Sequence, residues 1–541
     1  MKVLCMALIF LVSLLFGLVR LQNPCPERGK RDLRADNSAA LEATCVPQYF
    51  DQKLDHFDKS NNKTWKQRYY IYSELYDTYK FYPSIPLFLI LGGEMAVNYG
   101  TATNNSPMFS IGKDYKALMV VLEHRYYGES KPTPNITTEN LKYLSSRQAV
   151  EDIAYFVDEI KKKYGMKCNN EVVLFGGSYA GALAAWTRLK HPDKINVVQA
   201  SSAPVANIYN FRGFNNVVRS SIKLYDDKCA SVIYEGAMKQ QELAQTEEGQ
   251  KNLTEKFQAC RTLTDKNNRR AFFQTQIGQI GHQVQYNGTK NDSIPHTCSL
   301  LTAGGDEISS VDKLANYLIE TSSDNCTGYD YSADIKYLQH TDYISKDPFR
   351  QFLYMDCNEF GLSITSDTND SFYADTLGVD FYDDRCKDVF GDKYTSEYIK
   401  SQVEKTNAYY GKFNYRQGKV LFTNGQLDPY QAASILESND KIGYKALVIE
   451  NVGHTRDLDV ESEMDPPALK EARVQIKKII KGWIKALDFS KPIYGGIPTT
   501  CKQAEQYYQQ YQQQQAQKPS ASPTNSNPFS AVYSYLNMFN S

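Results

Sequence analysis

Residues 172–181 read Val-Val-Leu-Phe-Gly-Gly-Ser-Tyr-Ala-Gly, and this stretch decides the fold. The apolar run 172–175 is typical of a buried strand, and it stops at two glycines. Ser178 follows, and residues 182–189 after it are rich in good helix formers. The pattern predicts a strand, a sharp turn and a helix, with a serine at the turn. Gly176 and Ala180 flank the serine at positions where a larger side chain would clash in so tight a turn.

A serine in this setting is typical of the nucleophile elbow of α/β-hydrolases, where a strained turn projects the hydroxyl above the sheet. The usual pattern is Gly-x-Ser-x-Gly, but here Ala180 takes the last position and Gly181 follows it. The alternative is a glycine-rich turn with an incidental serine. The elbow interpretation requires an acid and then a histidine further along the chain, each in a loop after a strand.

The chain has seven histidines, and only His454 lies well beyond the elbow and directly after a strand-like run, residues 446–449. The preceding strand-like run, 420–423, leads into a turn-rich loop that contains Asp428. Ser178, Asp428 and His454 therefore form the predicted catalytic triad, although each alone could be an ordinary loop residue. Asp457 is a competing acid, but it is three residues past the histidine and follows no strand.

An oxyanion hole needs two backbone N–H donors. One is predicted at Tyr179, directly after the nucleophile. The other is predicted at Gly93, because the strand-like run 86–91 ends in Gly-Gly-Glu. A plain turn is the alternative for these glycines.

The first 20 residues predict a signal peptide, because one positive charge precedes an apolar run that ends at a glycine. A retained anchor fits less well, since a span needs about 20 apolar residues, and no later stretch is long and apolar enough. We therefore expect a secreted or lysosomal protein without a membrane span. Eight Asn-x-Ser/Thr glycosylation sequences agree with secretion: Asn62, Asn104, Asn135, Asn252, Asn287, Asn291, Asn325 and Asn369.

Eleven cysteines include Cys5 in the predicted signal peptide, which leaves an even number, as expected in an oxidising compartment. Six lie in the middle of the chain and are predicted to form disulfides among themselves, with 15 pairings open: Cys229, Cys260, Cys298, Cys326, Cys357 and Cys386. None has the Cys-x-x-Cys spacing of a metal site. The predicted chemistry requires no metal and no organic cofactor.

The net charge of −1 argues against nucleic acid and against an anionic membrane surface as partners. A homodimer stays open.

Composition divides the chain into blocks. A polar leader is expected at 21–44, and strand–helix alternation over 45–205 predicts the first part of an α/β core. Residues 206–395 lose the alternation and predict a helical cap inserted between the nucleophile strand and the acid strand. Residues 396–500 return to strand and helix, and the Gln-, Tyr-, Ser- and Pro-rich stretch 501–541 is predicted to be disordered.

Two helices are predicted in more detail. One covers 145–163 and opens with a Ser145-x-x-Gln148 capping box. The other begins at Pro466-Pro467 and should pack on the sheet through an apolar face.

Several stretches together resemble the secreted and lysosomal serine peptidases that include prolyl carboxypeptidase, dipeptidyl peptidase II and thymus-specific serine protease. They cover most of residues 50–490: Leu54-Asp55-His56-Phe57, Gln67-Arg68-Tyr69-Tyr70, Glu123-His124-Arg125-Tyr126-Tyr127-Gly128, Gly176-Gly177-Ser178-Tyr179, Cys357-Asn358-Glu359-Phe360-Gly361, Asn424-Gly425 and Asp428-Pro429. The tetrapeptide Ser178-Tyr179-Ala180-Gly181 looks closest to the thymus-specific branch.

The resemblance implies an α/β-hydrolase core with a helical cap, a peptide substrate, and exopeptidase action next to proline through a small apolar pocket. Tyr430 stands where a tryptophan is common, and Ala182 where prolyl carboxypeptidase has a methionine, so both are expected at the pocket. Only one histidine, His454, stands where a double histidine is common. The resemblance leaves the choice between a carboxypeptidase and a dipeptidyl peptidase open.

Selection of a peptide terminus needs a charged partner for that terminus. Glu94 and Glu359 are the candidates for binding a substrate ammonium, and the alternative for Glu359 is a structural hydrogen-bond acceptor. Two other functions stay open: a lipase or esterase on the same fold, and a catalytically silent binding protein.

Overall fold

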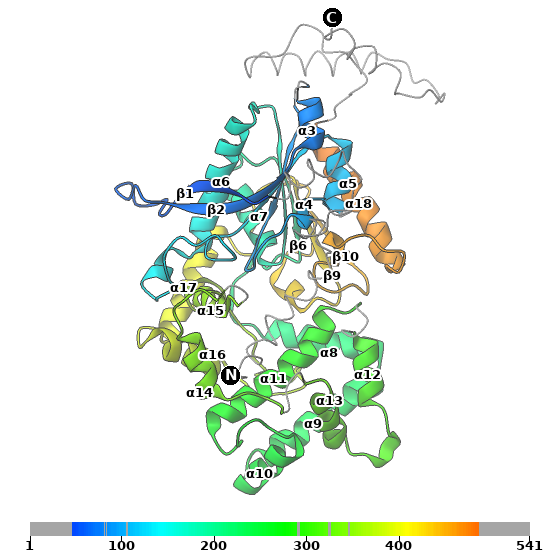
Figure 1. Cartoon of the computed structure of the whole chain (residues 1–541). Helices are drawn as coiled ribbons and strands as arrows, with labels where there is room; N and C mark the ends of the chain where they lie inside the picture. Colours follow the sequence, from blue (N-terminus) through cyan, green and yellow to red (C-terminus); the bar gives the residue numbers. More distant parts are fainter. Residues whose placement is uncertain are drawn as a thin grey trace, which may run out of the picture.

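The central layer is an eight-stranded sheet with the strand order β1-β2-β4-β3-β5-β6-β9-β10 (Figure 1). The computed structural model describes residues 46–485 apart from 81, 83, 104–106, 289–292, 323–325 and 345–346. The predicted signal peptide, leader and tail lie outside the described residues. The strands are β1 Gln48–Lys53, β2 Thr64–Tyr72, β3 Leu87–Leu91, β4 Leu118–Leu122, β5 Val172–Gly177, β6 Val197–Ser201, β9 Val420–Gly425 and β10 Lys445–Ile449.

In the part of the sheet with the order β4-β3-β5-β6-β9-β10, each strand runs parallel to its neighbours. At the other end of the sheet, β2 pairs antiparallel with β4, and β1 pairs antiparallel with β2. Strands β3 and β4 are buried along their whole length, because a parallel sheet covered on both faces needs continuous apolar strands. The strands predicted at 86–91, 420–423 and 446–449 are confirmed within two residues at each end.

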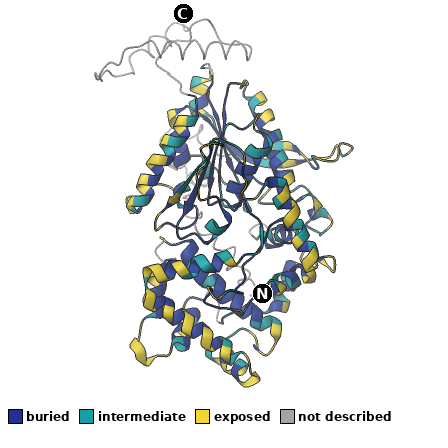
Figure 2. Ribbon diagram, turned by 180° about the vertical axis from the view of Figure 1, so that it is seen from behind, coloured by how far each residue is buried: buried dark blue, intermediate teal, exposed yellow. Residues whose placement is uncertain are grey.

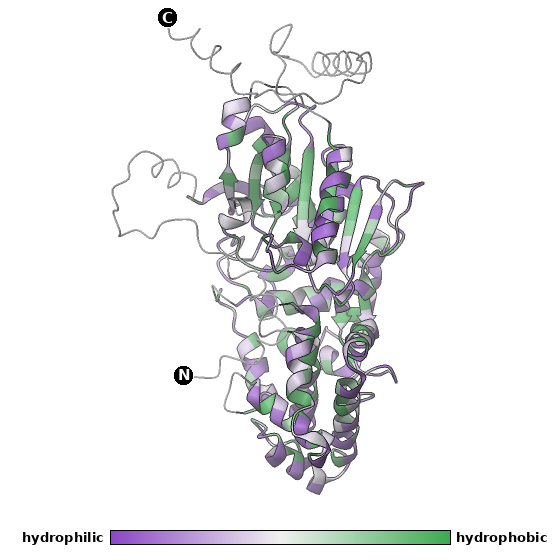
Figure 3. Ribbon diagram, turned by 90° about the vertical axis from the view of Figure 1, so that its right-hand side faces the viewer, coloured by the Kyte–Doolittle hydropathy of each residue, from purple (hydrophilic) through white to green (hydrophobic). Residues whose placement is uncertain are grey.

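Helices cover both faces of the sheet. On β3, Leu87, Leu89 and Leu91 pack in one core with α6 Ser146–Lys163 and α7 Tyr179–Lys190. The alternate residues Phe88 and Ile90 pack in a second core with α5 Pro107–Asp114 and α18 Pro467–Trp483. Figure 3 shows the hydrophobic strands lying between these more polar helices. The predicted packing of the 467–483 helix on the sheet is confirmed.

The capping box predicted at the start of α6 forms only in part. The Ser145 hydroxyl accepts a hydrogen bond from Gln148 N at 3.2 Å, as predicted. The Gln148 amide does not return to Ser145. Its Nε2 donates to Asp55 Oδ1 at 2.7 Å and its Oε1 accepts from His56 N at 3.0 Å. The reciprocal half of the prediction was wrong because a tertiary contact with the N-terminal segment takes this side chain.

A mostly helical insertion lies between β6 and β9 and forms the cap below the sheet in Figures 1 and 2. It contains α8 Arg212–Tyr225, α9 Asp227–Leu243, α10 Glu247–Lys256, α11 Lys266–Gln285, α12 Ile294–Leu301, α13 Ser310–Glu320, α14 Tyr331–Leu338, α15 Phe349–Met355, the π-helical turn η3 Asp356–Phe360 and α16 Val379–Phe390. Strands β7 Ile208–Asn210 and β8 Gly361–Ser363 pair in parallel within this region, and α17 Ser396–Tyr410 leads back to the sheet.

Short elements complete the described residues: α3 Glu74–Tyr79, α4 Gly100–Thr103, η1 Asn140–Tyr143, η2 Gly305–Glu307, η4 Pro429–Ala433 and η5 Arg456–Leu458.

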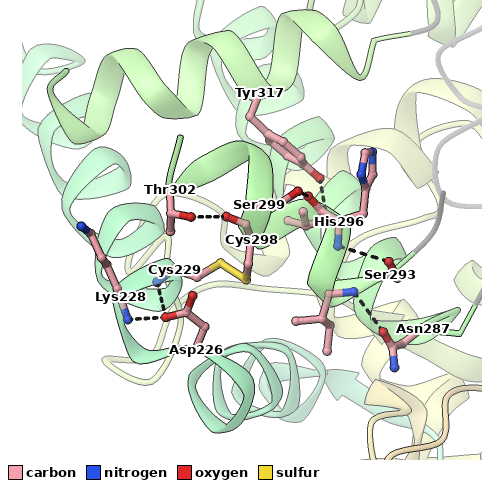
Figure 4. The surroundings of a disulfide bond; sticks show 12 residues. Asp226, Lys228, Cys229, Asn287, Ser293, His296, Cys298, Ser299, Thr302 and Tyr317 are labelled. Carbon is pink, nitrogen blue, oxygen red and sulfur yellow. Dashed lines mark hydrogen bonds between the residues drawn. A yellow bond between two sulfur atoms is a disulfide. The ribbon is translucent and has the colours of Figure 1, made fainter. Parts of the chain in front are cut away.

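Three disulfides brace the cap, and they pair the six central cysteines among themselves as predicted: Cys229–Cys298, Cys260–Cys326 and Cys357–Cys386. The first ties α9 to α12 (Figure 4). Around it, Asp226 caps α9 by accepting from Cys229 N at 3.2 Å, and Thr302 Oγ1 donates to the Cys298 carbonyl at 2.8 Å.

In the described part of the chain, no helix is both long and apolar enough to cross a bilayer. Among the predicted glycosylation sites, Asn62, Asn252 and Asn369 are exposed and Asn135 and Asn287 are half-buried. Asn104, Asn291 and Asn325 lie outside the described residues.

Candidate active site

Ser178 lies at the turn between β5 and α7 with φ at 57°, a strained backbone conformation for a serine. A Cβ added at Gly176 would lie 2.2 Å from the Ala180 carbonyl oxygen. A Cβ added at Gly181 would lie 2.9 Å from the carbonyl oxygens of Gly176 and Ser201. The close approach of β5 and α7 therefore requires glycine at Gly176 and Gly181, two residues before and three residues after Ser178. The usual second glycine position, two residues after the serine, is occupied by Ala180.

The histidine and the acid that sequence predicted lie side by side. His454 Nδ1 is 2.8 Å from Asp428 Oδ2, and the two residues are 2% and 0% exposed. Asp428 is held in turn because its Oδ1 accepts from Tyr430 N at 3.0 Å. The Nε2 atom of His454 is buried and has no hydrogen-bond partner among the described residues. This leaves Nε2 available as a proton acceptor.

The elbow and the histidine loop are adjacent. A Cβ added at Gly177 would lie 3.0 Å from Thr455 Cγ2, directly beside the positions of Ser178 and His454. The loop is anchored by Thr455 N, which donates to Ser202 Oγ at 2.9 Å. The structure therefore brings together the loops of all three predicted triad residues.

The competing acid, Asp457, is engaged elsewhere. Its carboxylate accepts hydrogen bonds from Gln199 Nε2 at 2.9 Å, from Thr423 Oγ1 at 2.6 Å and from Ser201 Oγ. These partners lie on β6 and β9, so Asp457 fastens the histidine loop to the ends of two strands.

The two predicted oxyanion donors lie close together. Tyr179 is the first residue of α7, and a Cβ added at Gly93 would lie 3.6 Å from Ala180 N. Within the described residues, neither the Tyr179 N–H nor the Gly93 N–H donates a hydrogen bond to the protein. Both are therefore available to a negative oxygen at Ser178.

A cavity opens at Ser178 between the core and the cap. Its lining is Glu94, Ser178, Tyr179, Trp186, Pro204, Asn207, Gln285, Phe352, Phe360, Leu362 and Tyr430. Five of these are aromatic, so the cavity suits an apolar substrate group. Tyr430 and Glu94 were predicted here, but Gln285, Phe352 and Leu362 come from cap segments and carry no motif that sequence reasoning could have used.

Two predicted substrate-binding residues lie elsewhere. Ala182 is completely buried in α7 and does not line the cavity; Trp186, one turn further along, does. Glu359 accepts from Ser146 N at 2.7 Å and from Ser146 Oγ at 2.9 Å, so both of its oxygens are occupied. Burial raises the pKa of Glu359 to about 7. The geometry favours the structural alternative for Glu359 and moves the predicted pocket wall from Ala182 to Trp186.

The cap contacts the histidine directly. The His454 N–H donates to the carbonyl oxygen of Gln285, the last residue of α11, at 2.7 Å. The Tyr286 and Tyr430 rings lie with their centroids 5.9 and 5.6 Å from the imidazole. The position of His454 therefore depends on the cap as well as on the sheet.

A serine at a strained elbow, next to the loop of a buried histidine–aspartate pair, places this chain among the serine hydrolases of the α/β-hydrolase fold. The pattern of the family described as serine carboxypeptidase S28 matches residues 52–476. The chain belongs to this family of serine peptidases.

The curated relatives agree. A Caenorhabditis elegans protein described as a serine protease is 31% identical over 457 residues, which is 82% of this chain and 88% of the relative. Human thymus-specific serine protease is 29% identical, over 81% of this chain and 86% of the relative. Bovine lysosomal Pro-X carboxypeptidase is 26% identical, over 81% and 87%.

Among solved structures, a proline iminopeptidase of Mycobacterium smegmatis matches 82% of this chain and all of its own, at 11% identity and a TM-score of 0.34. This likeness is too weak to carry an argument.

Proposed function

We propose that this chain is a secreted or lysosomal serine exopeptidase that cleaves peptides near one end, next to proline, with Ser178 as nucleophile, His454 as general base and Asp428 as the orienting acid. The observation that carries the proposal is the buried His454–Asp428 pair at 2.8 Å, whose imidazole keeps Nε2 without a partner among the described residues.

The chemistry follows from this arrangement. Asp428 holds the proton on His454 Nδ1, so Nε2 has the lone pair that takes the Ser178 proton. Ser178 Oγ attacks the scissile carbonyl, and the Tyr179 and Gly93 N–H groups stabilise the oxyanion. The imidazolium then protonates the leaving amine. Water hydrolyses the acyl-enzyme by the same steps, with His454 again as the base.

The cavity supports exopeptidase action. The cap residues Gln285, Phe352 and Leu362 line one side of it, which supports entry by the end of a peptide. The rings of Trp186 and Tyr430 offer flat apolar surfaces against which a proline ring can pack. The relative named Pro-X carboxypeptidase supports proline as the preferred neighbour.

Three disulfides support an oxidising compartment, secreted or lysosomal, and the lysosomal relative supports the second of these. The exposed glycosylation sequences also support a secreted or lysosomal protein.

The triad is tested with Ser178→Ala, Asp428→Asn and His454→Ala. Each should lower kcat by about 10⁴ or more, because triad members act as a unit, while the protein is still secreted. Asp457→Asn is the matched control for the acid, since Asp457 is equally buried but does not contact the imidazole. We expect it to lower stability and to cost far less activity than Asp428→Asn. A secreted Asp428→Asn protein with near-normal turnover would contradict the assignment.

The reaction class is tested on the wild-type protein. A fluorophosphonate probe should label Ser178, and no labelling would favour a catalytically silent binding protein. Peptides of the X-Pro-X type should be hydrolysed with a higher kcat/KM than p-nitrophenyl esters. The reverse preference would favour the lipase or esterase alternative.

A further inference from the structure

His124 is a buried histidine that takes no part in the catalytic steps described above. It lies two residues past the end of β4, and it is 5% exposed. Its Nε2 atom is 3.0 Å from the Tyr179 hydroxyl. Tyr179 directly follows the nucleophile, and its backbone N–H is one of the two donors assigned to the oxyanion hole. The contact therefore links the end of β4 to the turn that carries Ser178.

The direction of this hydrogen bond follows from the other ring nitrogen. His124 Nδ1 is 2.7 Å from the Arg125 carbonyl oxygen, which can only accept, so Nδ1 carries the proton. In the neutral imidazole Nε2 is then an acceptor, and the Tyr179 O–H donates to it. Burial lowers the pKa of His124 to about 4, which keeps the imidazole neutral at neutral and mildly acid pH. Both ring nitrogens are engaged, so His124 is not a second general base.

The backbone around His124 is held by two buried ion pairs. On one side of it, the Glu123 carboxylate pairs with the Arg68 guanidinium. On the other side, Arg125 Nε is 2.6 Å from Asp152 Oδ2. Charge-assisted hydrogen bonds of this kind are short and strong. The imidazole is therefore mounted on a segment that is itself fixed, as a group that orients another side chain must be.

The same segment supports the second side of the oxyanion hole. Gly92 N donates to the Leu122 carbonyl oxygen at 2.8 Å. Val97 N donates to Glu123 Oε1 at 3.1 Å. These two hydrogen bonds flank Gly93, the other oxyanion donor. The end of β4 therefore contacts both backbone segments from which the oxyanion donors come.

The Tyr179 side chain is fixed on two sides. Its ring centroid lies 5.4 Å from that of His124 and 5.1 Å from that of Phe360, and the residue is 4% exposed. Ser178, directly before it, has φ at 57°. Such strain persists only where the surrounding structure holds it. Anchoring the first side chain of α7 therefore helps to keep the turn, and the N–H at its end, in place.

We propose that His124 is a positioning residue, which accepts the hydrogen bond of the Tyr179 hydroxyl and so keeps the Tyr179 backbone N–H directed at the oxyanion that forms on attack by Ser178. This inference rests on the proposed function, since it concerns the transition state of that reaction. A hydrogen bond weakens steeply when its angle is poor. The negative oxygen exists only after attack, so misdirection of the N–H should affect kcat and leave KM largely unchanged.

Tyr179→Phe is the first test, because it removes the hydroxyl and keeps the ring and the backbone N–H. We expect kcat to fall about tenfold, less than the roughly 10²–10³ that loss of a whole oxyanion donor costs. KM should change by less than about twofold. Tyr127→Phe is the matched control, since this buried phenol packs on the same imidazole at 5.2 Å but donates only to Met355 Sδ, at 3.5 Å. It should keep the kcat of the wild type.

Two substitutions of His124 separate its two hydrogen bonds. An Asn amide can replace the Nδ1 donor, whereas a Gln amide oxygen can replace the Nε2 acceptor. His124→Asn should therefore lower kcat as Tyr179→Phe does, and His124→Gln should keep most of the activity. The double variant of Tyr179→Phe and His124→Asn should be no slower than the slower single variant, because both changes break one hydrogen bond. If His124→Asn is not secreted, Tyr179→Phe and its control still decide.

The proposal is overturned if Tyr179→Phe keeps the kcat of the wild type, if it changes KM alone, or if the losses of the single variants multiply in the double variant. Equal losses from His124→Asn and His124→Gln would overturn it as well. Labelling of the wild type by a fluorophosphonate tests the proposed function separately. A wild type that labels and cleaves peptides, with variants that contradict these expectations, refutes only the role of His124. A wild type that does not label refutes the proposed function itself.

Discussion

Glu359 shows at the scale of one residue how a carboxyl can join cap and core. Its two hydrogen bonds from Ser146 hold the start of α6 against the segment around Cys357. Burial raises its pKa to about 7, and the hydrogen bonds from Ser146 and the charge of Arg147 only partly offset this rise. The folded protein therefore binds this proton more tightly than the unfolded chain does.

The sign of the pH dependence follows. Below the ordinary glutamate pKa of 4.5 the contribution to stability is complete, and it is lost as pH rises toward 7. The loss can reach about 3 kcal/mol over this interval. We expect Tm to fall between pH 4.5 and 7, and Glu359→Gln to flatten that fall. The measurement is Tm against pH by scanning calorimetry for both proteins; parallel curves would show that Glu359 does not contribute.

The triad residues could be predicted because each has a local sequence context that physics constrains. The elbow needs small residues at fixed offsets from Ser178, and Asp428 and His454 each follow a strand end. Glu359 shares its segment with cavity residues, but sequence alone could not reveal that Ser146 occupies both of its oxygens.

At the scale of elements, the parallel strands were predictable and the antiparallel pair β1 and β2 was not. β3 and β4 are continuous apolar runs, because both faces of the sheet are covered. β1 and β2 mix charged and apolar residues, since they lie at the exposed edge and alternate between core and solvent. The pairing of the six cysteines depended on the arrangement of the cap helices, which spacing along the chain does not determine.

The disulfides lead to a prediction at this scale. Cys229→Ser with Cys298→Ser removes a link between α9 and α12, and neither cysteine is among the residues that line the cavity. Cys357→Ser with Cys386→Ser frees the turn that carries the cavity residue Phe360. Each loss should cost roughly 2–4 kcal/mol of stability. We expect both pairs to lower Tm, but only the second to lower kcat/KM markedly at a temperature where both proteins are folded.

Circular dichroism melts and initial rates on one peptide give the two readouts. Equal activity losses from the two double variants would contradict a local role for Cys357–Cys386.

At the scale of the whole molecule, the cap over the sheet limits what reaches Ser178. The cavity at Ser178 is lined on one side by the cap residues Gln285, Phe352 and Leu362, which should favour a peptide end over a chain passing through. We expect peptides of a few residues to be hydrolysed and an unfolded protein chain to lose residues only from its end. Mass spectrometry of the products checks this. Internal fragments at early times would show that chains can enter sideways.

The order of blocks along the chain followed from composition, since the loss of strand–helix alternation after residue 206 coincides with the start of the cap helices. How the cap sits on the sheet did not follow, because it depends on packing between segments more than a hundred residues apart.

The contact between the Gln285 carbonyl and the His454 N–H also bears on how such a protein can be re-engineered. A cap taken from a relative and grafted onto this core would have to supply a carbonyl at the same point, or the backbone of the histidine loop would lose one of its hydrogen bonds. Chimeras between family members should therefore be designed with the end of α11 and the histidine loop exchanged as one unit.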